Sequence, residues 1–141
     1  MVNIIYRHYE TGDEQGLADL FNISFQQNGA AFVRSTKNWI WRFVQSPGFE
    51  PEMCQVAVDT DNSLIIGAVY ANPIENIPIG NKIYLVGDIN DVSCHPNYTK
   101  RGIATKLMKM ALDYMREKGC DFSFLSTGYE GFARKKLYKK Y

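Results

Sequence analysis

The chain has 141 residues, 45% of them hydrophobic, which is enough for a single domain with one core. Its formal net charge of +1 at pH 7 excludes a strong overall attraction to nucleic acid or to acidic membranes, and we expect neither as a partner. Because the sequence contains no apolar run that could cross a bilayer and no signal-peptide pattern, it predicts a cytoplasmic protein.

The first part of the chain predicts a strand and two helices. Residues 2–6 are rich in β-branched and aromatic side chains, which is typical of a strand. Capping residues at 11–13 precede apolar residues at helical spacing, and residues 35–36 can cap a second helix that stops at the Pro and Gly of 46–48. The polar, glycine-containing segment 26–31 separates the two helices.

The middle of the chain predicts a β-hairpin followed by a long strand. Residues 54–58 and 64–71 are strand-like, and the Asp- and Asn-rich residues 59–63 predict the turn between them. Two prolines and a glycine in residues 72–80 predict a break in the regular structure. A long, broken strand is predicted over residues 83–94.

The last third predicts a helix, a strand and a second helix. Residues 100–118 place apolar side chains on one face, and Gly119 is a typical stop signal. Residues 122–125 predict a strand, after which a final helix runs to the C-terminus. The resulting order, βααβββαβα, predicts an α/β domain with a mixed sheet.

Residues 92–104 are the most informative segment, because they pass from a strand through a glycine-bearing turn into a long helix. Such a turn presents backbone N–H groups at the positive end of a helix dipole, which favours phosphate binding. Lys100 and Arg101 add two cations, and Gly102 allows a ligand to approach the backbone closely. The turn alone leaves two interpretations open, a phosphate site and an ordinary helix start.

Two motifs resemble those of the GCN5-related N-acetyltransferase (GNAT) superfamily. Residues 101–104, Arg-Gly-Ile-Ala, are similar to the second half of its central motif, in which Thr99 stands where Arg or Gln is more frequent. Residues 131–141 resemble its Ala-Arg-x-Leu-Tyr-x-Lys helix, with one extra residue or a shifted alanine. The resemblance implies a single N-acetyltransferase domain over residues 1–141, with a mixed, mostly antiparallel sheet flanked by helices.

The superfamily fold normally continues with two more strands, which do not follow within residue 141. Either the chain is a fragment of a longer protein, or the fold is truncated. A truncated sheet would expose an edge beside the fifth strand, and we expect an intact chain of this length to form a homodimer through it.

The resemblance also implies an acetyl-CoA-dependent N-acetyltransferase that acts directly on a primary amine of a small molecule or a peptide. The pantetheine arm would pair with the backbone of Val92, Ser93 and Cys94. The turn would hold the pyrophosphate of coenzyme A, through Thr99, Lys100, Arg101, Gly102, Ile103, Ala104 and Thr105. The first two helices would form part of the acceptor site. Trp39 and Trp41, two apart on a helix, cannot share a face, so we expect one to pack inward and the other to line the acceptor pocket.

The transfer needs an acid for the departing thiolate and a base for the amine. Tyr138 matches the tyrosine that the superfamily often uses as the acid, and a phenol of pKa about 10 stays protonated at neutral pH. Asp88 and Asp91 are candidates for the base. Being three residues apart, they face opposite sides of a regular strand, although a bulge would alter that parity. The alternative for Tyr138 is an ordinary packed tyrosine. The alternative for either aspartate is a loop cap or a salt-bridge partner.

Other polar residues predict no further chemistry. Cys94 and His95 are adjacent in a strand and point to opposite faces, so we expect no thiolate nucleophile and a turn role for His95. The three cysteines lack the spacing of a metal site or a redox pair, so we expect free thiols and no metal. The rival function is a non-catalytic acyl-CoA-binding regulatory module.

Overall fold

The computed structural model describes residues 2–26 and 33–126. Over these residues the elements follow the predicted order, up to and including the fifth strand. The helices are α1 (Glu14–Gln26), α2 (Thr36–Arg42) and α3 (Ile103–Glu117), and the strands are β1 (Ile4–His8), β2 (Cys54–Asp59), β3 (Leu64–Ile79), β4 (Lys82–Cys94) and β5 (Phe122–Phe124). The final helix predicted at the C-terminus lies outside the described residues.

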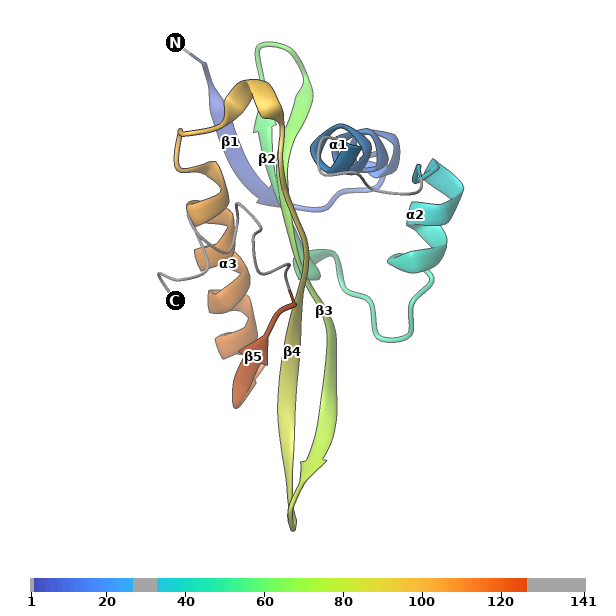
Figure 1. Cartoon of the computed structure of the whole chain (residues 1–141), viewed down its shortest axis with the longest axis vertical. Helices are drawn as coiled ribbons and strands as arrows, with labels where there is room; N and C mark the ends of the chain where they lie inside the picture. Colours follow the sequence, from blue (N-terminus) through green and yellow to red (C-terminus); the bar gives the residue numbers. More distant parts are fainter. Residues whose placement is uncertain (1, 27–32, 127–141) are drawn as a thin grey trace.

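The strands form one sheet in the order β1-β2-β3-β4-β5. Neighbouring strands are antiparallel except β4 and β5, which run parallel to each other. Helices α1 and α2 cover one face of this sheet, and α3 covers the other (Figure 1). This mixed, mostly antiparallel sheet flanked by helices confirms the predicted fold class.

An apolar layer seats the first turns of α3 against the sheet. Ile103, Leu107 and Ala111 of this helix are buried there. Gly67 of β3 permits the close approach, because a Cβ atom at this position would lie 2.8 Å from Ile103 Cγ2 and 2.9 Å from Leu107 Cδ1. Since Gly67 pairs with Cys94, the start of α3 is fixed beside the end of β4.

A second apolar layer holds α1 and α2 against the opposite face. Leu17 and Leu20 of α1 are buried in it together with Trp39 and Phe43. The indole N–H of Trp39 donates to Tyr70 Oη over 3.0 Å, and the ring of Phe43 stacks on that of Tyr70 with centroids 4.3 Å apart. Aromatic packing on β3 therefore anchors α2 despite its short length.

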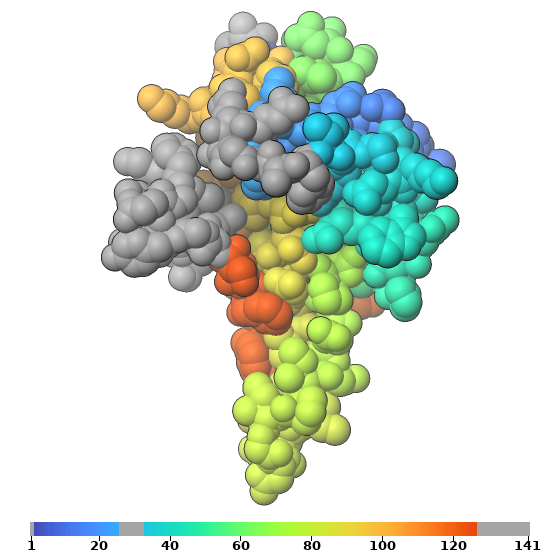
Figure 2. Space-filling view, turned by 45° about the vertical axis from the view of Figure 1, so that its right-hand side comes forward, coloured from blue at the N-terminus to red at the C-terminus, as the bar shows by residue number. Residues whose placement is uncertain are grey.

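The break predicted at residues 72–80 is wrong. Strand β3 continues to Ile79 and pairs with β4 as far as Lys82, so that the two strands form an arm that projects from the body (Figures 1 and 2). The register shifts by one residue between Ala71 and Ile74. Pro73, which has no N–H group for the ladder, lies at this irregularity and is tolerated there.

Candidate active site

A bulge in β4 brings the two candidate aspartates to the same face of the sheet. Gly87 faces α3, where a Cβ atom would lie 2.6 Å from Met115 Cε, so Asp88 faces α1 and α2. Between its pairs with Ala68 and Tyr70 of β3, β4 contains one extra residue, and Asp91 there has a φ of 46°. The carboxylate of Asp91 then also points to the α1 and α2 side. The bulge thus alters the alternation of side chains along β4, which is how two aspartates three residues apart come to lie on one face.

Asp91 is held by two arginines, Arg34 and Arg42, which no motif in the sequence indicates. Arg34 Nη1 lies 2.6 Å from Asp91 Oδ2, and Arg42 Nε lies 3.7 Å from the same oxygen. Arg34 is only 4% exposed, and its guanidinium lies 3.6 Å from the centroid of the Phe21 ring. The Asn22 side chain makes two hydrogen bonds to the backbone of Arg34. Its Oδ1 accepts from Arg34 N–H at 2.7 Å, and its Nδ2 donates to Arg34 O at 2.8 Å. This environment is that of a salt-bridge partner, because two cations engage the Asp91 carboxylate.

Asp88 has a different environment. Its carboxylate accepts a hydrogen bond from Asn90 Nδ2 at 3.2 Å, and no cation of the described residues lies within 4 Å of it. Partial burial raises the pKa of the Asp88 carboxyl, and the negative charge of Glu75 adds to that rise. A carboxylate with a raised pKa is a stronger proton acceptor at neutral pH. Of the two aspartates, Asp88 therefore has the better properties for a general base.

Asp88 also marks the place where the sheet opens. Strand β5 pairs with β4 only from Val86 to Asp88. Beyond this point the same edge of β4, residues 89–94, has no partner strand among the described parts of the chain. The backbone of Val92, Ser93 and Cys94 thus lies on an edge that an extended ligand can join as a strand.

The turn between β4 and α3 has the geometry of an anion site. One 3₁₀ turn, Pro96–Tyr98, leads to Lys100 and Gly102, whose φ angles of 63° and 75° are left-handed. The first helical hydrogen bond of α3 runs from Lys106 N–H to Gly102 O at 3.1 Å. The helix therefore provides no acceptor for the N–H groups of Ile103 and Ala104, and no other described residue accepts from them, so they can bind a ligand.

The helix begins later than predicted. The sequence predicts a start at Lys100, but α3 begins at Ile103, because the left-handed residues Lys100 and Gly102 cannot continue a right-handed helix. The side chains of Thr99, Lys100 and Arg101 are exposed, whereas that of Ile103 is buried in the core. Ala104 and Thr105 follow in the first turn and are half-buried.

Cys94 and His95 have separate roles. Burial raises the pKa of the Cys94 thiol, and its Sγ lies 3.8 Å from the carbonyl oxygens of His95 and Tyr98. His95 Nδ1 accepts from Asn97 N–H at 3.1 Å and so caps the 3₁₀ turn, as the turn role requires. The residues that the structure describes contain no group of His, Cys, Asp or Glu that could hold a metal ion. Tyr138 lies outside them.

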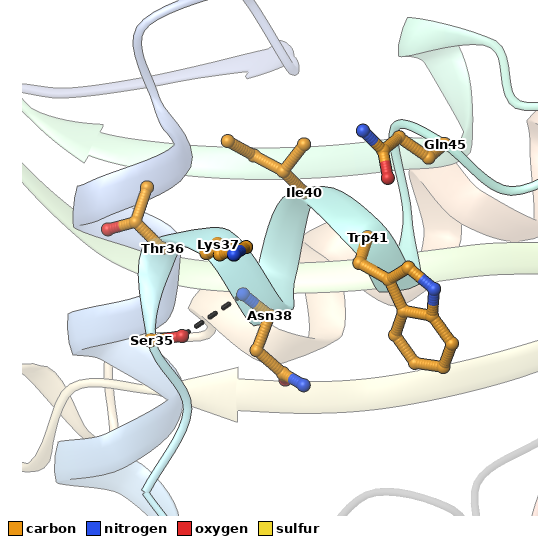
Figure 3. A pocket seen from close by; sticks show the side chains of 7 residues that line it. All are labelled: Ser35, Thr36, Lys37, Asn38, Ile40, Trp41 and Gln45. Carbon is orange, nitrogen blue, oxygen red and sulfur yellow. Dashed lines mark hydrogen bonds between the residues drawn. The ribbon is translucent and has the colours of Figure 1, made fainter.

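A surface depression on α2 is separate from these features. It is lined by residues 35–45 alone, among them the 67% exposed Trp41, and by no residue of β4 or of the turn (Figure 3). Trp39, two positions earlier, is fully buried, which confirms that the two tryptophans take opposite faces. None of the helices in residues 2–26 and 33–126 is both long and apolar enough to span a membrane.

A family model described as an acetyltransferase (GNAT) domain matches residues 5–141. The chain belongs to the GNAT acetyltransferase family. The match covers nearly the whole chain and confirms the GNAT membership inferred from residues 101–104 and 131–141. The open edge of β4 and the turn that follows it are thus parts of a GNAT domain.

Known GNAT proteins agree with this assignment. The chain is 31% identical over 98 residues to N-alpha-acetyltransferase 30 of Saccharomyces cerevisiae, in a match that covers 63% of this chain and only 50% of that protein. Among solved structures, glucosamine-6-phosphate N-acetyltransferase from Arabidopsis thaliana has a TM-score of 0.75 and 20% identity, with 98% of this chain and 89% of that chain covered. The NatC complex bound to Gag peptide and CoA gives a TM-score of 0.73 and 25% identity, with 98% and 82% covered.

Proposed function

We propose that this chain is an acetyl-CoA-dependent N-acetyltransferase that transfers the acetyl group directly to a primary amine. The observation that carries the proposal is the continuity between the unpaired edge of β4 and the turn that opens α3. The edge offers backbone hydrogen-bonding groups, and the turn offers N–H groups with two cations nearby. Coenzyme A, with a strand-like arm and a pyrophosphate, matches both features, and the related NatC structure contains CoA.

The cofactor would be held mainly by backbone groups. The turn at residues 99–105 would bind the pyrophosphate through N–H groups at the start of α3, with Lys100 and Arg101 adding positive charge. Residues 92–94 would pair with the pantetheine arm, since the side chains of Val92 and Cys94 pack into the core. The Cys94 carbonyl also accepts from Ser24 Oγ at 3.1 Å, a bond that the arm would share or replace. A backbone N–H group on this edge would polarise the thioester carbonyl.

Two side chains would move the protons. Asp88 would accept the proton of the acceptor amine, because its pKa is raised and it lies where β5 leaves β4. Tyr138 would donate a proton to the departing thiolate, a role that rests on its match to the family motif. Asp91 would remain in its ion pair with Arg34 and fix the bulge next to the reacting groups.

The acceptor would be the α-amine of a peptide or the amine of a small molecule. The peptide is favoured because the relative with 31% identity is named an N-alpha-acetyltransferase and the related NatC structure contains a Gag peptide. The Arabidopsis thaliana structure, whose name specifies an amino sugar phosphate, supports the small-molecule alternative. Both classes contain a primary amine, so the same transfer chemistry would serve either.

Thermal unfolding with acetyl-CoA, ATP or NAD at equal concentrations tests the cofactor. A ligand at a hundred times its dissociation constant stabilises a protein by about 2.7 kcal/mol, which is a readily measured shift. We expect a rise in Tm with acetyl-CoA only. An equal rise with all three ligands, or no rise in a folded sample, would contradict the proposal.

Release of free CoA thiol from acetyl-CoA, followed with short peptides and with small amines, then tests the transfer. We expect Tyr138→Phe to lower kcat by about tenfold or more while CoA binding persists. Binding of acetyl-CoA without turnover of any amine would instead support the regulatory binding module.

A further inference from the structure

One tyrosine ties the turn before α3 to a distant part of the sheet. Tyr98 Oη donates a hydrogen bond to Asp59 Oδ2 over 2.6 Å. Asp59 ends β2 and begins the turn to β3, whereas Tyr98 lies at the end of the 3₁₀ turn that precedes α3. The bond therefore joins two turns that are 39 residues apart in the chain.

Asp59 is a rigid partner for this bond. It is completely buried, and its Oδ1 accepts from the N–H groups of Asp61 and Asn62 at 3.0 and 3.3 Å. Its Oδ2 also accepts from Asn62 Nδ2 at 2.8 Å. The hydrogen bond from Tyr98 lowers the pKa of the Asp59 carboxyl, which is thus ionised at neutral pH. A hydrogen bond to an ionised acceptor is stronger than a neutral one.

The ring of Tyr98 contacts both sides of its own turn. The guanidinium carbon of Arg101 lies 5.3 Å from the ring centroid, and the His95 ring meets it edge-on at 5.4 Å. His95 is in turn fixed to β3, because its N–H donates to Ile66 O over 2.7 Å. Tyr98 is therefore the central contact between the sheet, the turn and Arg101.

The turn requires such support because of its backbone. Lys100 has a φ of 63° although it is not glycine, and Gly102 has a φ of 75°. Left-handed conformations of non-glycine residues persist only where the surrounding structure holds them. Within the described residues, Thr99 adds one long hydrogen bond from its Oγ1 to Pro96 O at 3.4 Å. The 2.6 Å hydrogen bond of Tyr98 to Asp59 is much shorter than this bond and connects the turn to the sheet.

We propose that Tyr98, anchored by Asp59, is a positioning residue that aims the N–H groups of the turn and Arg101 at the pyrophosphate of the cofactor. The proposal rests on the function proposed above and adds a residue pair that does not itself contact the ligand. Its consequence is that loss of a single hydroxyl at Tyr98 weakens cofactor binding while the reacting groups on β4 remain in place.

Titration calorimetry of the whole chain with CoA tests this role in Tyr98→Phe. We expect the Kd for CoA to rise by about five- to tenfold, because one charge-assisted hydrogen bond is lost while the ring and its contact with Arg101 remain. With saturating acetyl-CoA, kcat should stay within about twofold of the original value, since the chemical groups are unchanged. A loss of kcat without a change in Kd would overturn the proposal.

Tyr114→Phe is a matched control within α3, away from the turn that precedes this helix. Tyr114 Oη donates to Glu50 Oε2, also over 2.6 Å, near the C-terminal end of α3. This variant removes the same atom and the same kind of bond, and we expect the Kd for CoA to stay within about twofold. If Tyr98→Phe and Tyr114→Phe change the Kd equally, the effect is a general loss of stability and the proposal fails.

Asp59→Asn provides a second variant from the other side of the bond. We expect it to raise the Kd for CoA as Tyr98→Phe does, and the double variant to bind no more weakly than the weaker single variant. Additive effects of the two substitutions would overturn the coupling. A wild-type chain that binds no CoA would contradict the proposed function, whereas normal CoA binding by both single variants would overturn only the positioning role.

Discussion

Arg34 Nη1 lies 2.6 Å from Asp91 Oδ2 and joins the segment before α2 to the bulge of β4. The arginine is almost fully buried beneath α1, against the ring of Phe21. Asp91 takes a left-handed conformation, which Asp tolerates better than most residues, and the ion pair fixes its carboxylate there. The shape of β4 next to Asp88 thus depends on a residue outside the sheet.

Arg34→Met should strongly destabilise the fold. The substitution keeps much of the apolar stem but leaves the partly buried Asp91 carboxylate with only the more distant Arg42. Breaking a buried ion pair by removing one partner typically costs about 3 kcal/mol or more. Urea denaturation of the variant and the wild type measures the difference.

The double variant of Arg34→Met with Asp91→Asn separates the pair from other effects. We expect it to be less destabilised than the sum of the two single variants, because neither charge is then left alone. Strict additivity would show that the two side chains do not interact in solution.

Asp88→Asn should lower kcat on the order of a hundredfold and leave the Kd for CoA nearly unchanged. The amide keeps the size and the hydrogen bond to Asn90 but cannot accept a proton from the amine. Asp113→Asn, on the exposed face of α3, removes a carboxylate of the same kind and is the control. Full activity of Asp88→Asn would move the role of base to another group.

The pH dependence of kcat/KM follows from the environment of Asp88. Burial raises the pKa of its carboxyl, so the carboxylate that accepts the proton is lost at a higher pH than for an ordinary aspartate. We therefore expect activity to fall with acidification at a pH above the usual aspartate pKa of about 4. In Asp88→Asn the residual activity should lack this acidic limb, and an unchanged limb would argue against the assignment.

Gly102→Ala should weaken CoA binding more than it weakens the fold. A methyl group there meets no atom within 4 Å, so the substitution causes no steric clash with the fold. Its main cost to stability, about 1 kcal/mol, comes from holding alanine at the left-handed φ of 75°. Gly119, with a φ of 83° and equally open surroundings after the end of α3, is the matched site. We expect Gly119→Ala to lower Tm similarly without changing the Kd for CoA, as calorimetry and thermal unfolding can measure.

The turn and α3 could be predicted because their signals are contiguous in the sequence. Residues 99–104 carry the basic and glycine pattern within a few positions, and the apolar spacing after Ile103 indicates one helix face. The local turn at residues 59–63 was likewise readable from its Asp and Asn content. In each case the residues that determine the structure lie within a few positions of one another in the sequence.

The arm and the ion pair could not be predicted in this way. Pro73 reads as a breaker, but the register shift beside it accommodates the missing N–H, which depends on how β3 aligns with β4. Arg34 and Asp91 are 57 residues apart and meet only because α2 packs on the face to which the bulge turns Asp91. Pairing register and helix packing are tertiary properties, and one sequence does not encode them locally.

The unpaired edge of β4 makes the proposed cofactor a structural component of the sheet as well as a reactant. Among the described residues, no strand pairs with residues 89–94 on this edge, although Ser24 Oγ donates to Cys94 O there, and an unpaired strand edge is a template for association with another chain. Occupied by a pantetheine arm, the same edge would be covered and its hydrogen bonds satisfied. We therefore expect preparations kept with CoA to remain dispersed longer than those without it.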